Sequence, residues 1–116
     1  GKIFNNSKFD LIINISEDGW FGNSIGPKQH FAHNIFRAIE SGKYLLRSAN
    51  NGIAAIINPL GIVEQKVEYG KSGYIDFKEA KKVKLTLFAK YGNKIFITLI
   101  LLYIFIIFSF NRIKNE

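Results

Sequence analysis

The sequence contains no cysteine, no methionine and only two prolines among its 116 residues. Without cysteine, the chain has no disulfide bond, no thiolate metal site and no cysteine nucleophile of its own. A chain of this length forms one modest domain at most. Because Gly1 stands where an initiator methionine would, we expect the sequence to begin inside a longer reading frame or after a processing cut. The polar stretch from Gly1 to Asp10 has no apolar core and is not typical of a signal peptide.

Acidic residues are also scarce, with nine Asp and Glu against sixteen Lys and Arg, which gives a formal net charge of +7. Most of this excess lies between Lys78 and Lys94, where six lysines accompany one glutamate. Such a cluster can bind nucleic acid, but no nucleic-acid-binding motif accompanies it. Next to an apolar segment, a lysine cluster more often contacts phospholipid headgroups, and we favour that interpretation.

An apolar run of sixteen residues from Ile95 to Phe110 contains no charged residue. At the rise of an α-helix it is about 24 Å long, slightly short of a hydrocarbon core of about 30 Å. Lys94 and Arg112 flank it and can extend to the two interfaces. We predict a transmembrane helix over 94–112, followed by a tail at 113–116. A buried helix is the alternative, but a segment that is apolar on every side could hardly be enclosed by the remaining chain.

The rest of the sequence predicts an α/β fold. Apolar and β-branched residues at Leu11–Ile15 indicate a buried strand, and the Gly-rich stretch 16–27 indicates a loop. Apolar residues at helical spacing predict an amphipathic helix over Pro27–Ser41. Turn signals separate three further predicted strands and one candidate short strand: Tyr44–Ala49, Ile53–Asn58, Ile62–Val67 and, as the candidate, Tyr74–Phe77.

Two pairs of titratable residues are candidate sites of chemistry. His30 and His33 lie three residues apart on the predicted helix, a spacing that can bring two imidazoles to one metal ion. No third ligand is evident, so a surface or packing role is favoured over a metal site. Glu17 and Asp18 are adjacent, and adjacent side chains on an extended segment diverge, which argues against an acid/base pair.

A third acidic residue, Glu40, lies in the last turn of the predicted helix, where its charge opposes the helix dipole. This placement indicates a specific basic partner. Lys43 and Arg47 are the two candidates, and the role is expected to be structural.

The pair Trp20–Phe21 lies in the Gly-rich loop. Two large aromatic side chains are costly to leave in water, so either they fold back into the core or they face an apolar ligand or a bilayer surface. The residues alone leave both alternatives open.

Read in order, the loop, helix and hairpin resemble the C-terminal part of the apolipoprotein N-acyltransferase family of the nitrilase superfamily. Order and spacing make this resemblance specific, and it covers roughly residues 10–110. The matching segments are Asn14–Pro27 (NISEDGWFGNSIGP), Gln29–Phe31, Arg37–Glu40, Leu45–Ser48, Asn50–Ile53, Pro59–Gly61, Leu85–Thr86 and Tyr91–Asn93.

The resemblance implies that residues 1–93 form the C-terminal part of a nitrilase-like (carbon-nitrogen hydrolase) α-β-β-α sandwich. The family transfers an acyl chain from a phospholipid to the N-terminal diacylglyceryl-cysteine of a lipoprotein, through a thioester on a cysteine. Its implied partners are the phospholipid acyl donor, the lipoprotein acceptor and the membrane, without nucleic acid, cofactor or metal. Its implied location is the bacterial inner (plasma) membrane, with this domain on the periplasmic side of a multi-pass protein. The lysine distribution of this segment alone would favour the cytoplasmic side.

None of the family's catalytic Glu, Lys and Cys can be assigned to a residue of this chain. We therefore expect a C-terminal piece of the enzyme that is inactive by itself, with Trp20 and Phe21 contacting substrate. The sequence departs from the family pattern at Leu87, Phe88 and Lys90, so a role that needs a guanidinium at Lys90 is in doubt. The alternatives are a fragment of a carbon-nitrogen hydrolase such as an amidase, or a non-catalytic, membrane-anchored remnant of a split gene.

Overall fold

The computed structural model describes residues 9–114, without the side chains of 111, 113 and 114. It is built around a four-stranded sheet in the order β1-β2-β3-β4, in which β1 and β2 are parallel and the other neighbours antiparallel. The elements in chain order are β1 (Leu11–Glu17), the short 3-10 helix η1 (Gly19–Phe21), α1 (Gly26–Ser41), β2 (Tyr44–Asn50), β3 (Ala54–Ile57), β4 (Val63–Val67), α2 (Leu87–Tyr91) and α3 (Lys94–Lys114).

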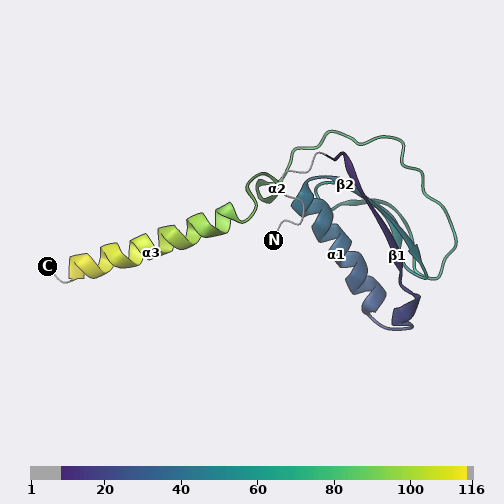
Figure 1. Ribbon diagram of the computed structural model, residues 1–116, viewed down its shortest axis with the longest axis horizontal. Coiled ribbons are helices and arrows are strands. Elements are labelled where there is room, and N and C mark those ends of the chain that lie inside the picture. Colours follow the sequence, from purple (N-terminus) through teal and green to yellow (C-terminus); the bar gives the residue numbers. More distant parts are fainter. Residues whose placement is uncertain (1–8, 115–116) are drawn as a thin grey trace.

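Helix α1 connects the two parallel strands and covers one face of the sheet (Figure 1). Parallel neighbours require such a crossover, since a tight turn can join only antiparallel strands. The helix ends at Gly42, which has a φ of 66° and donates its N–H to the carbonyl of Ala38. The core between helix and sheet is formed by Ala38, Leu45, Ala55 and Ile57, with Ile12, Phe31, Ile35 and Val63 packed against it.

The strand predicted at Leu11–Ile15, the helix and the three following strands are confirmed, with ends that move by one or two residues. The expected burial of the first strand is wrong, because none of its residues is buried. The candidate strand at Tyr74–Phe77 is wrong, because residues 68–86 contain no helix or strand. Other contacts hold this segment against the sheet. The rings of Phe77 and Tyr44 lie 5.4 Å apart, and the side-chain amide of Gln65 donates to the carbonyl of Asp76. Figure 1 shows the segment on the side of the sheet away from α1.

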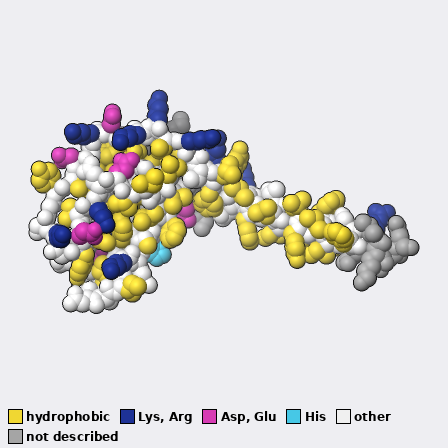
Figure 2. All heavy atoms as spheres, turned by 180° about the vertical axis from the view of Figure 1, so that it is seen from behind, with side chains coloured by type: hydrophobic (Ala, Val, Ile, Leu, Met, Phe, Trp, Pro, Cys, Tyr) yellow, Lys and Arg dark blue, Asp and Glu magenta, His cyan; other side chains and the backbone are white. Residues whose placement is uncertain are grey.

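The uncharged run from Ile95 to Phe110 forms most of α3, which extends away from the sheet with apolar side chains exposed along its length (Figure 2). Among the residues that the structure describes, no helix is long and apolar enough to cross a membrane. The transmembrane helix predicted over 94–112 is therefore not confirmed.

The α/β expectation is confirmed as one helix layer on a four-stranded sheet, which fits part of a nitrilase-like fold. A second sheet, as the α-β-β-α sandwich requires, does not occur among residues 9–114. On the face of the sheet away from α1, the side chains of Ile13 and Ile15 are 66% and 83% exposed. The predicted tail at 113–116 lies partly outside the described residues.

Candidate functional site

A buried ion pair lies where the parallel strands β1 and β2 end. Asp18 directly follows β1, Arg47 lies within β2, and both side chains are fully shielded from solvent. The Arg47 guanidinium donates from Nη2 to Oδ2 of Asp18 over 2.6 Å. Charge-assisted bonds of this kind are short and strong, and burial is tolerable only because the two charges are paired.

The remaining donors of Arg47 join this pair to the surrounding backbone. Nη1 donates to Oδ1 of Asn14 over 2.7 Å, and Nε donates to the carbonyl of Ile53 over 3.0 Å. One guanidinium thereby connects β1, the loop after β1 and the start of the hairpin after β2. This side chain adds to the β1–β2 backbone pairing that also positions these segments.

The other oxygen of Asp18 binds two further side chains. Ser16 donates its hydroxyl to Oδ1 over 2.9 Å, and Nδ1 of His30 lies 2.8 Å from the same oxygen. Burial alone would raise the pKa of Asp18, but the hydrogen bonds from Arg47, His30 and Ser16 outweigh it and hold the pKa below its ordinary value. Asp18 is therefore ionised, and both of its carboxylate oxygens already have hydrogen-bond partners.

The turn between β2 and β3 leaves no room for a side chain beside this carboxylate. A Cβ on Gly52 would collide with Oδ2 of Asp18 and with the methyl group of Ala49. The backbone N–H of Asp18 also donates to the carbonyl of Asn50 over 2.9 Å. The glycine is thus required by close packing, and the turn and the loop after β1 are held in contact.

The aromatic pair lies on the short helix η1, which begins one residue after Asp18. The carbonyl of Asp18 accepts the N–H of Phe21 over 3.1 Å. The ring of Phe21 packs edge-on against the ring of His30, with 5.8 Å between centroids, and lies over Gly26. Trp20 is 88% exposed, so Phe21 anchors the loop while Trp20 projects into solvent.

Neither aromatic residue folds back into the core, since η1 contains no buried residue. The buried ion pair of Asp18 and Arg47 holds the base of this loop. The indole of Trp20 is exposed at its outer side. The arrangement is suited to binding an apolar group at Trp20. The Asp18 carboxylate itself is already engaged by Arg47, Ser16 and His30.

The side chains of the adjacent residues Glu17 and Asp18 diverge, as the sequence indicates. Asp18 points inward, while Glu17 is exposed and accepts the N–H of Gly19 over 2.7 Å. The partner of Glu40 is Arg37, at 2.6 Å, and both candidates proposed from the sequence are wrong. Arg37 lies one turn away on the same helix, whereas Arg47 is committed to Asp18.

His30 contacts the Asp18 carboxylate and the Ser16 hydroxyl, and a shared site with His33 is not formed. Over residues 9–114, no group of three or more His, Cys, Asp or Glu side chains gathers in a geometry that could hold a metal ion.

Sequence reasoning missed the Asp18–Arg47–His30 network. Asp18 and Arg47 are 29 residues apart, and no spacing rule relates residues at that distance. A usable signal was the polar residue directly after the first of two parallel strands, because the carboxyl ends of neighbouring parallel strands meet at one edge of a sheet.

Comparison with known proteins gives a consistent result. The sequence matches the carbon-nitrogen hydrolase family over residues 3–77. Its curated relatives include the apolipoprotein N-acyltransferase of Rickettsia bellii, which is 47% identical over 113 residues, 97% of this chain and 22% of that protein. The apolipoprotein N-acyltransferase of Rickettsia prowazekii is 38% identical over 113 residues, 97% of this chain and 23% of that protein. That of Wigglesworthia glossinidia brevipalpis is 43% identical over 84 residues, 72% of this chain and 17% of that protein. The chain thus spans less than a quarter of the length of these relatives.

Proposed function

Because the chain belongs to the carbon-nitrogen hydrolase family, we propose that it supplies the C-terminal part of an apolipoprotein N-acyltransferase. Such an enzyme transfers an acyl chain from a phospholipid to the N-terminal diacylglyceryl-cysteine of a lipoprotein through a thioester acyl-enzyme. The observation that carries the proposal is the 47% identity to an acyltransferase over 97% of this chain. The nucleophile must come from elsewhere, since this chain has no cysteine.

Within that enzyme, residues 1–93 would form the C-terminal part of the nitrilase-like domain. We place the complete enzyme at the bacterial inner membrane, with this domain on the periplasmic side. The proposed acyl donor is a membrane phospholipid and the proposed acceptor a lipoprotein. The proposed reaction needs no cofactor, because the cysteine itself carries the acyl group.

The proposed contribution of this chain to substrate binding is the loop with Trp20 and Phe21. The indole of Trp20 is 88% exposed, so most of its apolar surface can meet a ligand. Phe21 lies against His30 and holds the loop in place. Trp20 would then contact an acyl chain of the donor or of the acceptor.

A chimera tests the proposal. The matching 113-residue segment of the Rickettsia bellii acyltransferase is replaced by this chain, and acylation of a diacylglyceryl lipoprotein is followed with phospholipid as donor. We expect the chimera to be active and this chain alone to be inactive. Trp20→Ala in the chimera should lower kcat/KM tenfold or more, because a buried aromatic contact contributes well over 1.4 kcal/mol, the free energy of a tenfold change.

Phe36→Ala provides the matched control, since Phe36 is a 61% exposed aromatic residue on α1, away from the loop. It should leave turnover unchanged. An inactive but folded chimera would contradict the acyltransferase assignment and favour a non-catalytic remnant. Hydrolysis of amides without transfer to lipoprotein would favour an amidase. If Trp20→Ala and Phe36→Ala change kcat/KM equally, the proposed contact between the loop and the substrate is contradicted.

A further inference from the structure

A lysine-lined pocket of about 460 Å³ lies at the opposite end of β1 and β2 from the aromatic loop, where α1 passes into β2. Lys43 lines it from the start of β2, and Lys81 and Lys82 line it from the segment that crosses the sheet. We propose that this pocket binds the phosphate of an anionic lipid headgroup. The inference deepens the proposed function by naming a lipid contact that does not take part in acyl transfer.

The fold brings these lysines together from positions 38 residues apart. Gly42 has a φ of 66° and turns the chain so that Lys43 directly follows α1. The space above Gly42 is filled by the side chains of Leu85 and Ala89, whose nearest carbons would lie 2.9 and 3.0 Å from a Cβ there. This packing places the segment with Lys81 and Lys82 over the corner between α1 and β2.

The structure also fixes the two ends of the covering segment. Thr86 caps α2 by accepting the N–H of Ala89 over 3.1 Å. At the other end, the ring of Phe77 packs on Tyr44, a buried residue that lines the same pocket. The pocket is therefore held open by packed side chains, although the part of its wall formed by residues 80–85 has no regular secondary structure.

The charge of the pocket favours an anion. Its lining contains three lysines against one acidic residue, Asp10, and its other members are uncharged. Among the described residues, none of the three lysines forms an ion pair. The ammonium of Lys43 lies 5.7 Å from the centroid of the Phe9 ring, a cation–π contact that restrains it at the rim.

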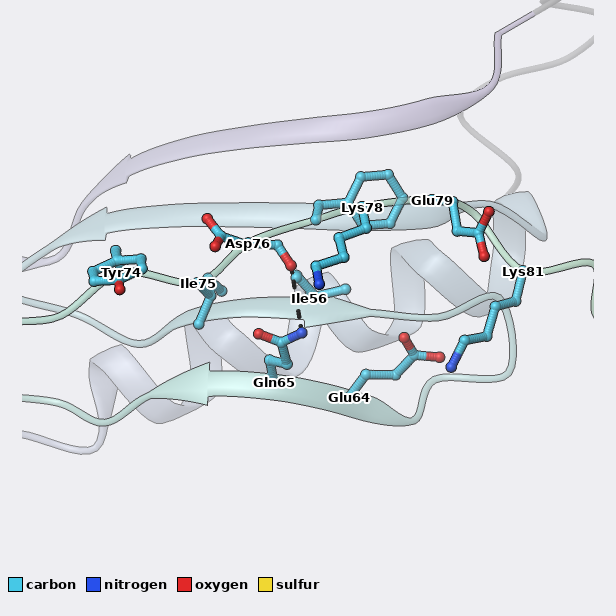
Figure 3. A pocket seen from close by; sticks show the side chains of 10 residues that line it. Ile56, Glu64, Gln65, Tyr74, Ile75, Asp76, Lys78, Glu79 and Lys81 are labelled. Atoms are coloured by element: carbon cyan, nitrogen blue, oxygen red, sulfur yellow. Dashed lines mark hydrogen bonds between the residues drawn. The ribbon is translucent and has the colours of Figure 1, made fainter.

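Lys81 also borders a neighbouring groove, shown in Figure 3, where its side chain extends toward Glu64. That carboxylate is already engaged, since Oε1 accepts hydrogen bonds from the hydroxyl of Tyr44 over 3.0 Å and from the amide of Asn58 over 3.2 Å.

A lipid is favoured over a free anion by what lies beside the pocket. Figure 1 shows α2 and α3 leaving the body at the end of α1 where the pocket lies. Figure 2 shows basic side chains on the body near the start of α3 and apolar side chains along that helix. Basic side chains next to an apolar helix match a phospholipid at an interface, because its anionic headgroup lies next to its apolar chains.

The test measures partition of the complete 116-residue chain onto vesicles of phosphatidylcholine, with and without phosphatidylglycerol. The exposed apolar residues of α3 contribute to binding on both kinds of vesicle. The readout is therefore the partition coefficient with phosphatidylglycerol divided by the coefficient without it. A lysine near an anionic surface contributes about 1 kcal/mol, so each pocket lysine removed should lower the ratio about fivefold. Lys81→Gln with Lys82→Gln, and separately Lys43→Gln, are the test variants.

Matched controls separate a pocket from diffuse charge. Lys78→Gln with Lys84→Gln removes the same charge from the same segment, but neither residue lines the pocket. Lys28→Gln, an exposed lysine at the other end of α1, is the control for Lys43→Gln. Replacement of the pocket lysines by arginine should restore the preference, and circular dichroism checks that every variant is folded.

A larger effect of the pocket variants than of their controls supports the proposal. Equal effects, or no preference for phosphatidylglycerol in the unaltered chain, would overturn it. Added glycerol 1-phosphate distinguishes the two sources of phosphate: competition at millimolar concentration identifies a site for the free phosphate ester, and its absence identifies a site for the lipid at the bilayer. Because no turnover is measured, a negative result here leaves the acyltransferase proposal standing, and an inactive chimera leaves this one standing.

Discussion

The buried pair of Arg47 and Asp18 allows a quantitative prediction about stability. Both side chains are fully shielded from solvent, and their charges are joined by a 2.6 Å hydrogen bond. Replacing Arg47 by methionine keeps much of the side-chain volume but leaves the Asp18 carboxylate buried without its counter-charge. Removal of one partner from such a pair typically costs 3–5 kcal/mol. The substitution also removes the donors to Asn14 and Ile53.

We therefore expect Arg47→Met to lower the free energy of unfolding by about 4 kcal/mol, a large share of the 5–15 kcal/mol that is usual for a small domain. The measurement is urea unfolding of the complete chain in a non-ionic detergent, followed by far-ultraviolet circular dichroism. Trp20 fluorescence is unsuitable as the folding probe because the indole is 88% exposed in the folded chain.

The chain contains its own control in the pair Arg37–Glu40, which has the same 2.6 Å separation but side chains that are 39% and 24% exposed. Arg37→Met should cost no more than about 1 kcal/mol, because solvent screens an exposed pair. A double variant of Arg47→Met with Asp18→Asn should cost less than the sum of the single changes, since the second change removes the charge stranded by the first. Equal costs of Arg47→Met and Arg37→Met, or strict additivity of the double variant, would refute this account of the pair.

Three further predictions concern the same region. The pKa of Asp18 is lowered in the folded chain, so its contribution to stability is complete above its unfolded pKa of about 3.9 and is lost as the pH falls through the folded pKa. The urea midpoint should therefore decline below about pH 4, and it should decline less steeply in Asp18→Asn. Gly52→Ala should destabilise the chain by about 1–3 kcal/mol, since the new methyl group meets Asp18 and Ala49; a midpoint equal to that of the unaltered chain would contradict the observed packing. Trp20→Ala should change the free energy of unfolding by no more than about 0.5 kcal/mol, because an exposed side chain contributes little to folding, so a large loss of stability would show that the loop is needed for the fold itself.

Much of the fold could be predicted from local patterns. The helix from Gly26 to Ser41 and the strands β1 to β4 follow from apolar periodicity and from the turn residues between them, because these signals depend on a few neighbouring residues. The resemblance to the acyltransferase family likewise rested on short motifs in order. The uncharged run at Ile95–Phe110 correctly predicted a helix, whereas the membrane span expected there is not confirmed among the described residues.

The candidate sites depended on contacts between distant segments. The exposure of Trp20 could not be read from the sequence, because a Gly-rich loop permits both inward and outward placement of its aromatic residues. The same holds for segment 68–86, whose residues at Tyr74–Phe77 have strand-like composition but lie on the sheet through side-chain contacts instead of joining it.

Local sequence patterns are enough to predict the order of helix and strands, and the sequence directly shows that this chain has no cysteine and that its lysines gather before the apolar run. The pairing of Arg47 with Asp18 instead of Glu40, and the place of Lys43 beside Lys81 and Lys82 in one pocket, become visible only in the folded chain. Secondary structure follows from interactions within a few residues, which a sequence displays directly. The choice of partner for a charge follows from burial and from the meeting of strand ends, which exist only after the parallel strands and their crossover helix have packed together.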